Sequence, residues 1–172
     1  MHTKALSIID LFTRHHLVRT WTLALLFIWF ANSLTYYGLW FLSSQIDKNI
    51  FYSMTLLSLV EIPGIVLTAA FVEKFNRKSI LVAVMLIGGV ACTIAALLSP
   101  DYSQLKMWLA VLGKCTISGS FALIYVYTVE IFPTVLRISG LGLCSMFARI
   151  GGMTAPYLLQ LVSALHKLVL TR

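Results

Sequence analysis

Long apolar stretches, separated by short polar connections, make up most of the chain. Five stretches are predicted to form membrane-spanning segments, at about residues 21–42, 51–72, 79–98, 105–129 and 140–165. About 20 helical residues, rising about 1.5 Å each, cross the roughly 30 Å of hydrocarbon in a bilayer. Helices are expected throughout, because an open strand edge leaves backbone groups unsatisfied in lipid. The pattern therefore predicts an all-α integral membrane protein.

The two ends of the chain are more polar than the predicted spans. Within residues 1–20, four apolar side chains fall near one helical face while basic residues lie elsewhere, as in an interfacial amphipathic helix. These apolar residues are Leu6, Ile9, Leu11 and Phe12. The polar and basic start is not a signal peptide. Residues 166–172 are too few for another span and are predicted to form a short tail.

Composition supports the bilayer as the solvent. Hydrophobic residues make up 59% of the 172 residues and charged residues only 11%, whereas soluble domains are about a quarter charged. The net charge of +7 raises nucleic acid as a partner, but no basic cluster is interleaved with exposed aromatic residues. Basic cytoplasmic loops explain the same excess. We therefore expect lipid, and no nucleic acid, as a partner.

The distribution of basic residues predicts the orientation. With five alternating spans, seven bases fall on the side of the N-terminus and four on the other. The seven are Lys4, Arg14, Arg19, Lys74, Arg77, Lys78 and Arg137; the four are Lys48, Lys106, Lys167 and Arg172. The positive-inside rule then places the N-terminus in the cytoplasm.

Three ionisable residues, Glu61, Lys114 and Arg149, lie well inside predicted spans. Such residues usually face a cavity or a partner, because a central charge costs about 2.5–3.5 kcal/mol on insertion scales. Two interpretations stay open: the charges pair with one another or with other helices, or at least one lines an aqueous substrate path. Lys114 lies nearest the outer surface and has a third possibility, that of reaching the interface.

Polar and helix-breaking residues also interrupt the spans. The first span contains a polar, flexible break, which suits either a cavity wall or helix packing; it consists of Asn32, Ser33, Thr35, Tyr36, Tyr37 and Gly38. Pro63 and Gly64 are expected to kink the second span. The three cysteines show no CxxC spacing, and no HExxH motif occurs. The sequence therefore predicts no metal, no cofactor and no catalytic residues, and the protein is not expected to be an enzyme.

Six motifs together resemble the organic-ion branch of the major facilitator superfamily, solute carrier family 22. They are "YYGL" at 36–39, "VEIPG" at 60–64, "EKFNRK" at 73–78, "GKCTIS" at 113–118, "YTVEIFPTVLR" at 127–137 and "CSMFARIGGMTAPYL" at 144–158. Their order and spacing match helices seven to eleven of that family's twelve, which covers almost the whole chain. The fold implied is therefore part of a C-terminal six-helix transporter domain at residues 21–165.

The resemblance implies transport of small organic ions by alternating access around a site near the bilayer midplane. It assigns to the substrate cavity Tyr36, Tyr37, Glu61, Lys114 and Arg149. Cation carriers of the family tend to have Asp where Arg149 stands, so the resemblance favours anionic or zwitterionic substrates, with organic cations as the alternative. Asn76 replaces the glycine usual in the loop between helices eight and nine, and asparagine tolerates a left-handed backbone there.

The same resemblance places "YTVEIFPTVLR" at the cytoplasmic mouth. Pro133 is expected to end the helix before it, and Thr134 to help start the next. An acid followed by a base occurs both here and in the preceding cytoplasmic loop. We expect the four residues to form a charge cluster that closes when the cavity faces outward: Glu73, Arg77, Glu130 and Arg137.

The resemblance leaves helices one to six and twelve of the family pattern without a counterpart in this chain. A missing N-terminal transporter half is therefore an expected partner, alongside the bilayer and the organic ion. A multi-pass protein of the plasma membrane is implied. The alternative is a truncated, non-transporting membrane protein that modulates a full-length transporter or misassembles with it.

Overall fold

The protein is all-α. A computed structural model describes residues 16–43, 50–98, 102–134 and 136–170, and within these ranges five helices and no strand are found. The helices are α2 (His16–Ser43), α3 (Ile50–Lys74), α4 (Arg77–Leu97), α5 (Ser103–Ile131) and α6 (Arg137–Leu170). Each predicted span coincides with one of them, and only the span 79–98 extends one residue beyond its helix, so the helical prediction is confirmed. Most of the amphipathic segment predicted for residues 1–20 lies outside the described residues.

Four helical segments are long and apolar enough to cross a membrane: Arg19–Phe41, Phe51–Lys74, Arg77–Ala95 and Gln104–Ile131. Among the described residues, no segment of α6 is one of them. Arg149 and several glycine and hydroxyl residues dilute the apolar character of α6. The membrane crossing by residues 140–165 therefore stays a prediction.

The polar stretch in the first span does not interrupt its helix. α2 is helical throughout residues 32–38, so the expected flexible break is wrong as a statement about the backbone. Side-chain hydroxyls help to explain this, since Thr35 donates to the carbonyl of Ala31 at 2.9 Å, one turn earlier in the helix. Pro63 likewise lies inside α3, which continues as a helix on both sides.

The connection between α5 and α6 is built around Pro133. α5 ends at Ile131, and Phe132 is extended, with φ −79° and ψ 134°. Proline disfavours the helical conformation in the residue before it, so the predicted helix end is confirmed. α6 begins only at Arg137. Thr134 lies three residues earlier, and the expectation that it starts the helix is wrong.

The connection between α3 and α4 is a tight turn. Asn76, the residue before α4, has φ −61° and ψ 127°, which is extended backbone. The tolerance of asparagine for a left-handed backbone is therefore not needed here, because the chain reverses without any positive φ among the described residues. In this turn, the N–H of Ile80 donates a hydrogen bond to the Asn76 carbonyl at 3.1 Å.

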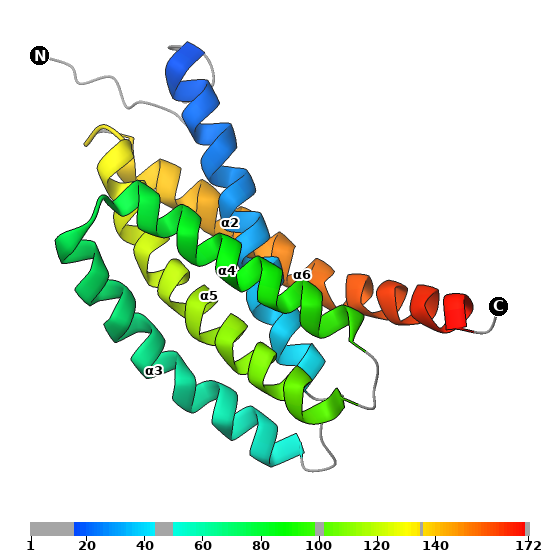
Figure 1. The fold of residues 1–172 in the computed structure, drawn as a ribbon. Helices are drawn as coiled ribbons and strands as arrows, with labels where there is room; N and C mark the ends of the chain where they lie inside the picture. The colour runs from blue at the N-terminus through cyan, green and yellow to red at the C-terminus, as the bar shows by residue number, and fades with distance from the viewer. Residues whose placement is uncertain (1–15, 44–49, 99–101, 135, 171–172) are drawn as a thin grey trace, which may run out of the picture.

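The bundle is organised around α5. This helix contacts α3 and α4 along much of its length and also packs on α2, while α2 packs extensively on α6 (Figure 1). Two glycines bring α3 and α5 close together: a Cβ at Gly64 would meet the Cys115 carbonyl, and one at Gly119 would meet the Thr68 hydroxyl. Because glycine has no side chain, the two backbones can approach at these positions.

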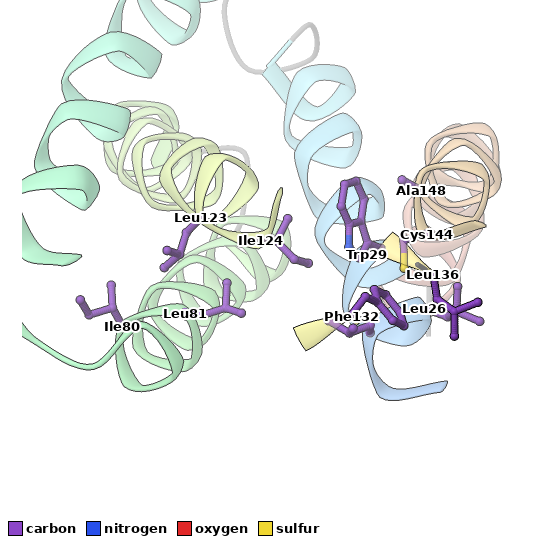
Figure 2. Close-up of a cluster of buried hydrophobic side chains, with 11 residues drawn as sticks. Leu26, Trp29, Ile80, Leu81, Leu123, Ile124, Phe132, Leu136, Cys144 and Ala148 are labelled. Atoms are coloured by element: carbon purple, nitrogen blue, oxygen red, sulfur yellow. The ribbon is translucent and has the colours of Figure 1, made fainter. Parts of the chain in front are cut away.

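The hydrophobic core gathers at the end of the bundle where α2, α4 and α6 begin and α3 and α5 end, called here the base end. Figure 2 shows side chains from α2, α4, α5, α6 and the α5–α6 connection meeting there. The cluster consists of Leu25, Leu26, Trp29, Ile80, Leu81, Leu123, Ile124, Phe132, Leu136, Cys144 and Ala148. Phe132 is 2% exposed, and a Cβ at Gly140 would lie 2.7 Å from its ring. Packing of Phe132 on α6 therefore depends on that glycine.

Candidate functional site

Three spans contribute one polar side chain each to a cluster in the middle of the bundle. α2 supplies Tyr36, α3 supplies Glu61 and α5 supplies Lys114. The Tyr36 hydroxyl donates a hydrogen bond to Oε1 of Glu61, and Nζ of Lys114 lies 3.8 Å from the same oxygen. Three of the five predicted cavity residues are thus brought together. We call these three residues the charged cluster.

Lys114 is the most unusual member of the charged cluster. Its side chain is 0% exposed, and Nζ lies 3.0 Å from the centroid of the Tyr36 ring and 5.5 Å from that of Trp40. Among the described residues, no acceptor makes a hydrogen bond with Nζ. The ammonium is therefore stabilised by the negative face of an aromatic ring and by a nearby carboxylate.

Glu61 connects the charged cluster to the exterior of the bundle. Its side chain keeps 28% exposure, whereas Lys114 keeps none. The carboxylate accepts one hydrogen bond from Tyr36 and has further acceptor capacity. The cluster therefore combines a buried cation with an acid that remains accessible.

Tyr37 and the unpredicted Phe121 pack against Tyr36, and the unpredicted Tyr125 lies next to Phe121. The Tyr37 ring meets the Tyr36 ring edge to face, with centroids 5.4 Å apart, and Phe121 of α5 also lies 5.4 Å from Tyr36. Tyr125, one turn beyond Phe121, packs 4.5 Å from the ring of Trp29. Phe121 and Tyr125 carry no signal of their own in the sequence, because α5 contains apolar residues on every face.

Arg149 does not join the charged cluster. It lies on α6 and is exposed, and no ion pair or hydrogen bond links it to another described side chain. Its neighbour Ala148 faces inward and accepts a 2.5 Å hydrogen bond from Ser33 of α2. The guanidinium of Arg149 is therefore presented on the outside of this five-helix bundle. The sequence alone predicted a deeper position, near the other cavity residues.

Of the four-residue charge cluster predicted at the cytoplasmic side, the structure shows one ion pair. Arg77, at the start of α4, pairs with Glu130 near the end of α5, with side chains 43% and 47% exposed. Within the described ranges, Glu73 and Arg137 form no ion pair with these two. Glu73 is exposed, and Arg137 has a buried Nε without an acceptor. The four-residue network stays a prediction, and Arg77–Glu130 is its observed part.

A set of buried hydrogen bonds joins α2 to its neighbours. Trp29 Nε1 donates to Thr128 Oγ1 at 3.0 Å, and Ser120 Oγ lies 2.6 Å from Asn32 Oδ1. Asn32, Ser33 and Ser120 therefore serve helix packing, one of the two possibilities open from the sequence. The link between Trp29 and Thr128 was not predicted, since nothing in the local sequence shows which helix faces which.

The described residues offer no obvious place for a metal ion, since no three His, Cys, Asp or Glu side chains among them lie together. The chemistry available at the charged cluster is instead recognition of charge. An ammonium, a carboxylate and aromatic faces lie within a few ångströms of one another, between helices apolar enough to span a bilayer. These features define a multi-pass α-helical membrane protein with a charged site enclosed by its spans.

Similarity in sequence to known proteins identifies the family within this class. The chain is 37% identical over 154 residues to the organic cation transporter protein of Drosophila melanogaster, covering 90% of this chain and 28% of that protein. It is 34% identical over 153 residues to human solute carrier family 22 member 13, covering 89% and 28%. It is also 34% identical over 156 residues to solute carrier family 22 member 15-like of Xenopus tropicalis, covering 88% and 32%.

The chain belongs to solute carrier family 22 of the major facilitator superfamily. No family model matches it, so the membership rests on these relatives. The chain spans less than a third of the length of each of the three.

Proposed function

We propose that the chain contributes helices seven to eleven to a transporter that moves small organic ions across the membrane by alternating access. The charged cluster carries the proposal: Tyr36, Glu61 and Lys114 converge from three helices of a multi-pass bundle. Buried charges between membrane spans mark substrate or ion pathways, because they are costly to keep in lipid. The family membership supports the same activity.

The proposed substrates are anionic or zwitterionic. Two bases and one acid lie within the predicted spans, namely Lys114, Arg149 and Glu61, so a site that brought Arg149 together with the charged cluster would carry a net positive charge. Arg149 is accessible to a partner outside the five helices, and a guanidinium binds a carboxylate through two parallel hydrogen bonds. Organic cations are the second candidate, because Glu61 stays accessible beside the Tyr36 ring.

The proposed assembly includes the six helices of an N-terminal half, against which the exposed face of α6 and Arg149 would lie. Two halves that rock around a midplane site are the basis of transport in this superfamily. We place the assembly in the plasma membrane, as the family resemblance implies, with the N-terminus of this chain in the cytoplasm, as the distribution of basic residues predicts. A non-transporting protein that modulates a full-length relative is the rival assignment.

Uptake measurements test this function. Cells that express the chain with an N-terminal transporter half are expected to accumulate a labelled aromatic carboxylate, and Arg149→Ala is expected to reduce that uptake at least 10-fold. Lys106→Ala is the matched control, because Lys106 lies near the start of α5, away from the charged cluster. Unchanged uptake in Arg149→Ala at equal surface abundance would remove Arg149 from the substrate site.

The rival assignment has its own measurement. The chain is co-expressed with a full-length relative, and the uptake and surface abundance of that relative are recorded. A modulator is expected to change at least one of them. No change in either, together with carboxylate uptake by the assembled transporter, supports the transport assignment.

A further inference from the structure

Lys114 lies where an organic cation would bind. The usual elements of an ammonium site are an aromatic face within about 6 Å, a second ring and a carboxylate. All three surround Nζ of Lys114: the Tyr36 ring at 3.0 Å, the Trp40 ring at 5.5 Å and Glu61 Oε1 at 3.8 Å. We call this position of Nζ the ammonium seat.

We propose that the Lys114 ammonium is a tethered occupant of this seat, and that it sets the charge selectivity of the site by excluding free organic cations. The proposal rests on the transport function above and specifies its substrate class. While Lys114 occupies the seat, its charge is compensated by Glu61 and Tyr36. A soluble ammonium would then have to displace a cation of the same charge that is covalently held in place.

The contacts of Lys114 support occupancy over a purely structural ion pair. A structural lysine at an ion pair normally donates hydrogen bonds to its carboxylate, yet Nζ makes none with any described residue and lies over a ring face instead. Its side chain is 0% exposed, so the seat is fully enclosed while Lys114 fills it.

The seat also has a route of entry. Glu61 keeps 28% exposure and contacts both Tyr36 and Lys114. Shortening the side chain at position 114 would therefore leave a space lined by two rings and connected to the exterior beside a carboxylate. Such a space fits a small quaternary ammonium, which retains its charge at every pH.

The arrangement also explains what a carboxylate substrate gains. Lys114 has donor capacity that no described acceptor uses. A substrate carboxylate that takes the place of Glu61 beside Nζ would offer the missing acceptor, whereas a substrate ammonium meets an occupied seat. The same residue therefore favours one class of ion and rejects the other.

Chemical rescue tests the proposal. The wild-type chain, Lys114→Ala and Lys114→Gln are purified in lipid nanodiscs, and the binding of radiolabelled tetramethylammonium is measured at constant ionic strength. Lys114→Ala vacates the seat and is expected to bind tetramethylammonium at least 10-fold more tightly than the wild type. Lys114→Gln removes the charge but keeps a side chain of nearly the same length, so its gain is expected to be smaller. Tetramethylammonium chloride is also expected to raise the Tm of Lys114→Ala above its value in equal sodium chloride, with no such rise in the wild type.

Two controls separate the seat from general electrostatics. Lys106→Ala removes one positive charge from the same helix away from the cluster and is expected to bind as the wild type does. Tyr36→Leu combined with Lys114→Ala removes the aromatic face and is expected to bind tetramethylammonium no more tightly than the wild type. Wild-type-level binding in both Lys114 variants, or an equal gain in Lys106→Ala, overturns the proposal.

The outcome is distinguishable from that of the transport assignment, since equilibrium binding requires no transport. Carboxylate uptake by the assembled wild type without any gain in the Lys114 variants would refute the tethered occupant and leave the transport function standing. A gain in the Lys114 variants without any uptake would support the seat and refute the function.

Discussion

Arg77 and Glu130 form an ion pair that joins the start of α4 to the end of α5 at the base end of the bundle. The two residues are 53 positions apart, and both connections flanking them are short. The pair lies beside the hydrophobic core, which includes Ile80 one turn beyond Arg77 and Phe132 two residues beyond Glu130. A change at this contact therefore acts on the relative position of two helices that contact each other along much of their length.

Neutralising Glu130 is expected to change the balance between inward- and outward-facing states of the assembled transporter. Both side chains of the pair are partly exposed, and such pairs contribute only about 0–1 kcal/mol, so Glu130→Gln should shift the population ratio by up to about fivefold. Accessibility of single cysteines from each side of the membrane measures the ratio.

Lys78→Gln is the matched control for this prediction, because Lys78 is the exposed neighbour of Arg77 and forms no ion pair within the described residues. The exchange of charges in Arg77→Glu with Glu130→Arg should restore the wild-type ratio. Identical accessibility profiles in the wild type and Glu130→Gln would contradict a gating role.

Removal of the carboxylate from Glu61 is expected to destabilise the bundle by leaving the Lys114 charge without compensation. Breaking a buried ion pair costs about 3–5 kcal/mol, and the 28% exposure of Glu61 places the expected loss near the lower end of that range. The free energy of unfolding of Glu61→Gln, measured by denaturation of the chain in mixed micelles, tests this value.

A double variant shows whether the uncompensated charge of Lys114 causes the loss of stability in Glu61→Gln. Glu61→Gln with Lys114→Met removes both charges at similar volume and is expected to recover most of the lost stability. If the double variant is as unstable as Glu61→Gln alone, the loss comes from the Tyr36–Glu61 hydrogen bond and not from an uncompensated charge.

The hydrogen bond between Trp29 and Thr128 is expected to contribute about 1 kcal/mol to the packing of α2 on α5. Thr128→Val removes the acceptor and leaves the Trp29 N–H buried without a partner, so this substitution should destabilise the chain by about 1–3 kcal/mol. A double-mutant cycle with Trp29→Phe gives the coupling energy between the two side chains. Trp21→Phe, at a tryptophan that is 46% exposed on the same helix, should have little effect.

Gly119 is expected to be required for the contact between α3 and α5. A Cβ there would meet the Thr68 hydroxyl and lie 2.9 Å from the Gly64 carbonyl, which is backbone and cannot rotate away. Overpacking of this kind costs about 1–3 kcal/mol, so Gly119→Ala should lower the free energy of unfolding by that amount. The matched control is Gly38→Ala in α2.

At Gly38, a Cβ would meet no atom within 4 Å. Alanine in a helix interior is favoured over glycine by about 0.5–1 kcal/mol, so Gly38→Ala should be neutral or stabilising. Equal effects of the two substitutions would show that the close approach of α3 to α5 is not what constrains Gly119.

Much of the fold was predictable because membrane insertion depends on local properties. Runs of apolar residues of sufficient length identified the five helices, and Pro133 identified the end of α5 through its effect on Phe132. One error came from local conformation that neighbouring turns decide, namely the continuity of α2 through residues 32–38. In α2 the backbone keeps its own hydrogen bonds, since lipid offers no alternative partner.

The sequence by itself determined which residues are exceptional: a carboxylate and two bases within apolar spans, and an acid and a base in each of two connections. Only the tertiary structure decided which of them meet. Lys114 faces Tyr36 and Glu61 because α5 packs between α2 and α3, with glycines permitting the closest approach, whereas Arg149 faces away from that contact. Helix length follows from the chain alone, but helix partners depend on side chains far apart in the sequence, whose packing no local pattern specifies.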